Sequence, residues 1–327
     1  MKFYVGGYSN KIVLCNADIK KSSLSVIADF PANNATYLAL TRNKKIIYAV
    51  SEVENTGGGV SAYAVGSDLK LTYLNAINGN ESYACHLSTN YNDKILFESN
   101  YGDGTLSIFE IDGRLIRKNL TINHYGKSID PLRQDHSYLH FAREIPGSKE
   151  ILACDLGADM VILYEFDDNY TRVKTKTEFK IKPGSGPRHI AFEKSYFYLI
   201  NELSCELHTY LLDLHNKKIE LISCTNLKKS AADTAAAIRI NDNFLITSLR
   251  GWDMISVFKL DRNGCPVLIN EFDCCGECPR DFDLKDNQLI VANEISGTVC
   301  LFDFNKGFAK LADKIDVPGA ACICLAD

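Results

Sequence analysis

The stretch Gly184-Ser185-Gly186-Pro187-Arg188-His189-Ile190-Ala191-Phe192 and its continuation Tyr198-Leu199-Ile200-Asn201-Glu202-Leu203 decide the fold. The glycines and the proline predict a turn, after which the residues alternate as in a short strand. A second apolar strand follows and stops at a carboxylate. Arg188 therefore stands where one strand begins, and Glu202 where the next one ends. Variants of this unit recur along the chain, and we look for function in the polar residues that differ between copies at these two places.

The element that is easiest to follow along the chain is a turn and then a four-residue strand, which usually ends in an aromatic residue. It occupies residues 60–63, 106–109, 161–164, 207–210, 255–258 and 299–302, with a weaker copy at 12–15. Successive aromatic residues lie 46, 55, 46, 48 and 44 positions apart. An apolar strand and, ahead of it, a further strand precede most copies, and a variable strand follows. Each unit therefore holds about four strands.

Seven four-stranded units of this length predict an all-β fold, a seven-bladed β-propeller with antiparallel blades and a single domain over residues 1–327. The last unit has only one strand at the C-terminus, residues 320–325, and the N-terminus supplies the others at residues 3–5, 12–15 and 24–27. We therefore expect the last blade to be closed by both ends of the chain, which hides two exposed strand edges.

Composition narrows the classes of function. The net charge of -5 argues against broad nucleic-acid binding and against a basic membrane surface. The N-terminal residues read as a strand rather than a signal peptide, and the chain has no apolar run of about 18 residues. We expect a protein of the cytoplasm that is a monomer or a weak homodimer.

The chain has twelve cysteines, and half of them lie in apolar, strand-like runs. These are Cys15, Cys154, Cys205, Cys300, Cys322 and Cys324. With no export signal, we expect them to be small buried side chains and not disulfides. The cluster Cys274, Cys275 and Cys278 contains a C-x-x-C pair, but a structural zinc site needs about four ligands, usually from two such pairs. The only other close pair has the wrong spacing, so we predict no metal and no cofactor.

Short motifs spread over nearly the whole chain carry a family resemblance by their order and spacing. They include Tyr4-Val5-Gly6-Gly7-Tyr8, Cys85-His86-Leu87, Asn100-Tyr101-Gly102-Asp103-Gly104, Arg133-Gln134, Gly186-Pro187-Arg188-His189, Asn201-Glu202-Leu203, Arg250-Gly251 and Pro279-Arg280-Asp281-Phe282. With them the chain resembles the seven-bladed propeller lactonases, which include the bacterial propeller type of 6-phosphogluconolactonase and the fungal carboxymuconate-lactonizing enzyme.

The resemblance implies an active site made of a His, two Arg and a Glu at one end of a central channel. Position by position these are His140, Arg188, Arg250 and Glu202. Members of the family often carry Pro-His-x-His where this chain has Ser137-Tyr138-Leu139-His140. The second His survives as His140 and the first is replaced by Tyr138, so substrate contacts made by the first His are expected to differ. The resemblance also implies a small anionic lactone as the substrate.

These residue types suit lactone hydrolysis. A His can take the proton of an attacking water, and a fixed Arg can stabilise the oxyanion that develops. Glu202 could orient His140, hold an Arg in place or act as the base. Structural roles stay open: His140 could line the channel, Arg188 and Glu202 could form an ion pair within one blade, and Arg250 could cap a turn.

Further residues are candidates for substrate contact. His86, Tyr138, Arg133 and Arg280 are predicted to bind substrate, the two arginines as a cationic rim for a phosphate. His189 is a weaker candidate because it neighbours Arg188 and alternation should turn it away. Asp155-Leu156-Gly157-Ala158-Asp159 resembles a metal site by composition, but its place at a blade turn predicts turn chemistry instead.

Two other functions remain open from the sequence. A muconate-type lactonizing cyclase, which is an isomerase, needs the same arginines and the same acid–base group, so the four residues do not choose between the reactions. A non-enzymatic propeller that serves as a binding scaffold is the alternative from a different class.

Overall fold

The structure is a computed structural model of the protein that describes residues 1–53, 58–79 and 82–326. The regular structure of these residues consists of strands, which form seven four-stranded antiparallel sheets. The strands of the first half of the chain are β1 (Lys2–Gly7), β2 (Lys11–Asp18), β3 (Ser23–Pro31), β4 (Leu38–Leu40), β5 (Ile46–Ser51), β6 (Gly59–Val65), β7 (Leu71–Asn78), β8 (Ala84–Thr89), β9 (Ile95–Asn100), β10 (Thr105–Ile111), β11 (Leu115–Asn123), β12 (Leu139–Glu144), β13 (Ile151–Asp155) and β14 (Met160–Phe166).

The strands of the second half are β15 (Val173–Lys180), β16 (Pro187–Glu193), β17 (Tyr196–Asn201), β18 (Glu206–Asp213), β19 (Lys218–Asn226), β20 (Thr234–Asn241), β21 (Phe244–Arg250), β22 (Met254–Leu260), β23 (Pro266–Asp273), β24 (Pro279–Lys285), β25 (Gln288–Asn293), β26 (Thr298–Asn305), β27 (Phe308–Asp316) and β28 (Ala320–Leu325). No helix among the described residues has the length and apolar character that crossing a membrane requires.

Each predicted repeat is one sheet. The recurring four-residue element lies in the third strand of every sheet, that is in β2, β6, β10, β14, β18, β22 and β26. The apolar strand that precedes it is the second strand of the same sheet. The seven-bladed β-propeller with four-stranded antiparallel blades is therefore confirmed.

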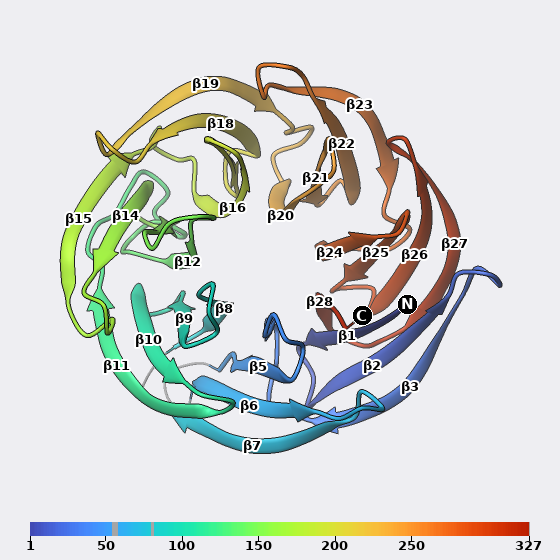
Figure 1. The fold of residues 1–327 in the computed structure, drawn as a ribbon. Coiled ribbons are helices and arrows are strands. Elements are labelled where there is room, and N and C mark those ends of the chain that lie inside the picture. The colour runs from blue at the N-terminus through green and yellow to red at the C-terminus, as the bar shows by residue number, and fades with distance from the viewer. Residues whose placement is uncertain (54–57, 80–81, 327) are drawn as a thin grey trace. The chain divides into compact units, whose positions relative to one another are not determined.

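The closing of one blade by both chain ends is also confirmed. β28 pairs with β1, and the sheet continues through β2 to β3, as the blue and red strands of Figure 1 show. The register places Phe3 opposite Leu325 and Val5 opposite Ile323. The strands at the two chain ends are thus paired with one another, and each covers the edge that the other would leave unpaired on that side.

The chain divides into two compact units by its internal contacts. One unit comprises Met1–Pro31 together with His189–Asp327, and the other comprises Ala32–Arg188. The division falls inside β16, so that Pro187 and Arg188 belong to the second unit and residues 189–193 to the first.

Within each unit, neighbouring sheets bury apolar side chains against one another. In the second unit, Phe97 and Ile108 of one sheet share a core with Ala153 and Tyr164 of the next. In the first unit, Val257 and Phe302 do the same for the sheets that contain β22 and β26. Four of the aromatic residues that end the recurring elements, Phe109, Tyr164, Phe258 and Phe302, lie in such apolar layers. Burial of such a side chain stabilises the fold by about 1.5–3 kcal/mol.

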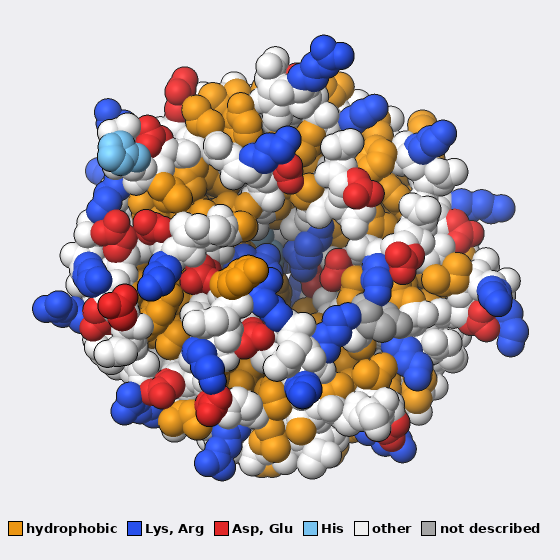
Figure 2. Space-filling model, viewed as in Figure 1, with side chains coloured by type: hydrophobic (Ala, Val, Ile, Leu, Met, Phe, Trp, Pro, Cys, Tyr) orange, Lys and Arg blue, Asp and Glu red, His pale blue; other side chains and the backbone are white. Residues whose placement is uncertain are grey.

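The six cysteines that were expected to be buried small side chains are buried. The face of the protein seen in Figure 2 carries Lys and Arg side chains interspersed with Asp and Glu, so charges of both signs alternate over it.

Candidate functional site

The first strand of most sheets carries an extra residue near its start. In β8, β12, β24 and β28, the pairing with the neighbouring strand skips Cys85, His140, Arg280 and Ala321 respectively. A β-bulge of this kind bends the strand and re-aims the side chain, and bulges are frequent beside active sites. Arg188 is the second residue of β16, as His140 is of β12 and Arg280 is of β24. One position of the repeat thus holds three of the predicted site residues.

A second position of the repeat lies at the end of the second strand. Glu202 follows β17 directly and Arg250 is the last residue of β21. Tyr101 and Glu294 follow β9 and β25 in the same way. The sequence analysis did not name these two as site residues, although aligning the repeats on Glu202 would have found them.

In the first unit, Glu202 and Arg250 form an ion pair across two sheets. Arg250 Nη2 lies 3.1 Å from Glu202 Oε2, and the two side chains are 14% and 4% exposed. The same nitrogen donates to the carbonyl oxygen of Ala235 at 3.2 Å. The buried Nε–H of Arg250 has no hydrogen-bond partner among the described residues. Of the roles considered for Glu202, holding an Arg in place is therefore one that the structure shows, and Arg250 presents a fixed donor.

A second Arg–Glu pair of this unit lies within a single sheet. Arg280 Nη1 donates to Glu294 Oε2 at 2.9 Å, and its guanidinium carbon lies 5.1 Å from the centre of the Tyr8 ring. The Cys278 thiol donates to the same carboxylate oxygen at 3.7 Å. Burial, and then the charge of Glu294, raise the pKa of Cys278 to about 11. The thiol therefore stays protonated near neutral pH.

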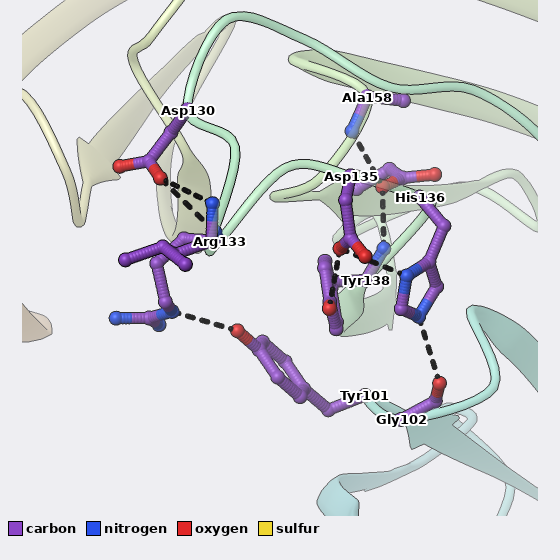
Figure 3. A network of polar contacts seen from close by, with 10 residues as sticks. Tyr101, Gly102, Asp130, Arg133, Asp135, His136, Tyr138 and Ala158 are labelled. Carbon is purple, nitrogen blue, oxygen red and sulfur yellow. Dashed lines mark hydrogen bonds and ion pairs between the residues drawn. The ribbon is translucent and has the colours of Figure 1, made fainter.

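In the second unit, Tyr101 connects the predicted base to two predicted substrate-binding residues. Its ring lies edge-on to His140, at 5.8 Å between centres, and 4.5 Å from the ring of Tyr138. Arg133 Nε donates to the Tyr101 hydroxyl oxygen at 3.1 Å, as Figure 3 shows. His140 itself is buried, whereas Arg133 and Tyr138 are half-buried. The structure thus brings His140, Tyr138 and Arg133 together around Tyr101.

The loop before β12 is held by carboxylates. Asp130 accepts the backbone N–H of Arg133 at 3.0 Å, and the Tyr138 hydroxyl donates to Asp135 at 2.7 Å (Figure 3). The hydrogen bond from Tyr138 lowers the pKa of Asp135. Burial and the same hydrogen bond raise the pKa of Tyr138, so its phenol keeps its proton. These contacts fix the orientation of the Tyr138 ring.

Turn chemistry explains the aspartates that resembled a metal site. Asp159 accepts the backbone N–H groups of Gly184 and Gly186, each at 2.6 Å. Both glycines have φ values in the left-handed region, +82° and +66°, which suit glycine. Asp155 accepts the backbone N–H groups of Tyr138 and Ala158, both at 3.0 Å. The two carboxylates thus position the loops that lead to Arg188 and to His140.

The other histidines lie elsewhere in the repeat. His86 follows the bulge of β8 and is paired with Ser99, so it does not occupy the position of His140. Its buried ring packs between Tyr37 and Phe141, with ring centres 4.5 and 4.6 Å away. His189 is buried next to Arg188. The Cys274 and Cys275 thiols bond to the carbonyl oxygens of Gly276 and Asp273, whereas Cys278 bonds to Glu294.

The fold is a β-propeller whose blades carry Arg, His and Glu residues at two matching positions. One protein family matches this chain over almost its whole length. The family is described as "Lactonase, 7-bladed beta-propeller", and the match covers residues 2–325. The chain therefore belongs to the family of seven-bladed β-propeller lactonases, and lactonase is its class of enzyme.

Individual relatives also match this chain over nearly the whole length of both proteins. A 6-phosphogluconolactonase from Bacillus subtilis is 28% identical over 98% of this chain and 95% of its own length. The crystal structure of a putative 6-phosphogluconolactonase from Bacteroides fragilis has a TM-score of 0.92 and 26% identity, covering 98% of this chain and 96% of that one. A periplasmic gluconolactonase from Pseudomonas aeruginosa has a TM-score of 0.93 at 21% identity, covering 100% and 99%, a likeness that shows the fold.

Proposed function

We propose that the protein hydrolyses 6-phosphogluconolactone to 6-phosphogluconate. The observation that carries the chemistry is Arg250, whose guanidinium is fixed by Glu202 and the Ala235 carbonyl while 14% of its side chain stays exposed. A donor held in advance of the reaction stabilises developing negative charge at little cost in reorganisation. The name of the Bacillus subtilis relative supports the choice of substrate.

In this proposal His140 is the general base. It takes a proton from water as the water oxygen bonds to the lactone carbonyl carbon. The carbonyl oxygen becomes an oxyanion, which Arg250 and Arg188 stabilise. When this intermediate collapses, the bond from the carbonyl carbon to the ring oxygen breaks, and the ring oxygen receives a proton. The product is the open hydroxy acid, and no redox partner is needed.

Arg133 and Arg280 are proposed to bind the phosphate. Both are half-buried cations next to an aromatic ring, Tyr101 for Arg133 and Tyr8 for Arg280. Guanidinium groups match phosphate oxygens with two parallel donors. Tyr138, which stands where the family often has the first His of Pro-His-x-His, is proposed to contact the sugar, and His86 stays a proposed substrate contact.

The cysteines and the net charge bear on where the enzyme acts and what it binds. Most of the cysteines that lie in apolar strands are buried small side chains, which fits a reducing compartment, so we propose that the enzyme acts in the cytoplasm. The net charge of -5 supports a small anionic substrate bound at local arginines and no nucleic-acid partner.

The test is hydrolysis of freshly made 6-phosphogluconolactone, followed by oxidation of the product in a coupled assay. We expect a rate well above spontaneous hydrolysis and a loss of about 10²–10⁴-fold in kcat for His140→Ala. The matched control is His215→Ala at an exposed turn, which should keep full activity. A wild-type rate equal to the spontaneous one refutes the proposal.

A further inference from the structure

One face of the β18–β19 hairpin carries three different metal-ligating side chains. Side chains two apart along a strand share a face, so Glu206, His208 and Tyr210 line up on β18. Cys224 of β19 is paired directly with His208 and lies on the same face. Leu207, on the opposite face, is part of a buried apolar core. The hairpin is therefore anchored on one face while the other presents carboxylate, imidazole and thiol groups.

The three groups are close enough to share an ion. His208 Nε2 lies 3.2 Å from Glu206 Oε2, and the ligand atoms of Glu206, His208 and Cys224 all lie within 4.8 Å of one another. Zinc bonds of about 2.0–2.3 Å to oxygen, nitrogen and sulfur place tetrahedral ligand atoms roughly 3.3–3.8 Å apart. Small rotations of the side chains bridge the difference, and Cys224 is exposed to solvent.

The imidazole of His208 is oriented as a metal ligand requires. Its Nδ1 lies 3.2 Å from the Tyr210 hydroxyl, and Tyr210 stacks on Phe197 at 4.9 Å between ring centres. Metal-binding histidines usually donate the second ring N–H to an outer acceptor, which fixes the tautomer, and the Tyr210 hydroxyl oxygen is able to accept it. In the tautomer with the proton on Nδ1, Nε2 presents its lone pair to the Glu206 carboxylate, and a cation between the two acceptors relieves their repulsion. In the other tautomer, Nε2–H donates to Glu206 Oε2 at 3.2 Å.

We propose that Glu206, His208 and Cys224 bind a zinc ion, with water in the fourth position. Oxygen, nitrogen and sulfur donors together select zinc over Mg²⁺ and Ca²⁺, which prefer oxygen ligands alone. The buried His208, 3% exposed, anchors the site, and the exposed Cys224 gives it an entry path. None of these residues has a part in the proposed hydrolysis, so the two proposals can fail separately.

The test is titration of the metal-free, full-length protein with Co²⁺, a spectroscopic substitute for zinc. We expect one equivalent to bind with a near-ultraviolet thiolate-to-cobalt charge-transfer band and visible bands of tetrahedral cobalt, both displaced by Zn²⁺. Cys224→Ser should abolish the charge-transfer band, and Glu206→Gln should weaken binding. Tyr210→Phe should weaken binding by about 10–100-fold, the usual effect of losing an outer partner of a ligand. Cys265→Ser, a half-buried thiol outside the hairpin, is the matched control and should leave the spectrum unchanged.

Two results would overturn the proposal. One is no saturable binding of Co²⁺ or Zn²⁺, which would mean that a proton joins His208 to Glu206. The other is an unchanged charge-transfer band in Cys224→Ser, which would place the ion on other thiols. His208→Gln is the stronger substitution but alters a buried side chain, so Cys224→Ser, at an exposed position, decides the outcome.

Discussion

The Glu202–Arg250 and Arg280–Glu294 pairs of the first unit use the same two residue types at similar distances, 3.1 and 2.9 Å, but they are built differently. Glu202 and Arg250 come from adjacent sheets, and the carboxylate is 4% exposed. Arg280 and Glu294 come from neighbouring strands of one sheet, and the carboxylate is 23% exposed. The first pair is a fixed and desolvated arrangement that suits transition-state stabilisation. The second is more open and suits contact with a charged group of the substrate.

The largest expected difference is between the kinetic constants of the Arg250 and Arg280 variants. For Arg250→Ala we expect kcat to fall by about 10²–10³-fold, the usual loss for one oxyanion donor. For Arg280→Ala we expect mainly a higher KM for the phosphorylated lactone, because the phosphate contact is the same in the ground state and the transition state. Steady-state assays with and without the phosphate group on the substrate measure both effects.

Gluconolactone, which lacks the phosphate, is the control substrate. Arg280→Ala should leave the kinetics on gluconolactone nearly unchanged, whereas Arg250→Ala should reduce kcat on both substrates. An equal loss of kcat in the two variants on both substrates would show that the difference in burial has no functional meaning.

The free energy of unfolding should fall more when Glu202 is replaced than when Glu294 is replaced. Glu202→Gln leaves the charge of Arg250 without its buried partner, which costs about 3 kcal/mol in the free energy of unfolding. Glu294→Gln removes a more exposed carboxylate and should cost about 1 kcal/mol or less. Urea unfolding of both variants, followed by two spectroscopic probes, measures the difference. The comparison breaks down if Glu294→Gln is the more damaging change.

The thiol of Cys278 offers the smallest and most local readout. Its pKa of about 11 is raised first by burial and then by Glu294, whereas Arg250 and Arg280 lower it. Glu294→Gln should therefore lower this pKa, and Arg280→Ala should raise it. The measurement is the pH dependence of iodoacetamide labelling at Cys278, read by peptide mass spectrometry, with Cys265 as the reference in the same sample. A pH profile that neither substitution moves would exclude electrostatic contact between the pair and the thiol.

The predicted residues differ in how far the sequence could place them. His140, Arg188 and Arg280 share the second position of their strands, and the repeat reveals this because strand alternation and turn chemistry are local properties. His86 was assigned to a comparable strand start, yet the register of β8 sets it beyond the bulge and among aromatic rings. A bulge moves a side chain by one position, and alternation alone does not show where the extra residue lies.

The sequence could not predict which side chains pair with one another, because the partners are far apart in the chain. Glu202 and Arg250 lie 48 positions apart in the chain, and Arg133 and Tyr101 lie 32 apart. Such contacts depend on how sheets pack and loops fold back, and several residue types satisfy the same local pattern. Tyr101 and Glu294 were missed because an aromatic residue and a carboxylate after a strand read as ordinary turn residues.

The sequence by itself determined the number of blades, the strand that each repeat supplies and the closing of one blade by both chain ends. These follow from the alternation of apolar and polar residues within strands and from the longer spacing between turns. Both patterns can be read from residues that are close together in the sequence. Only the tertiary structure decided which carboxylate holds which arginine, which side chain each bulge re-aims, and that a hairpin face gathers Glu206, His208 and Cys224. Those outcomes depend on distances between residues remote in the chain, which packing sets and local periodicity does not encode.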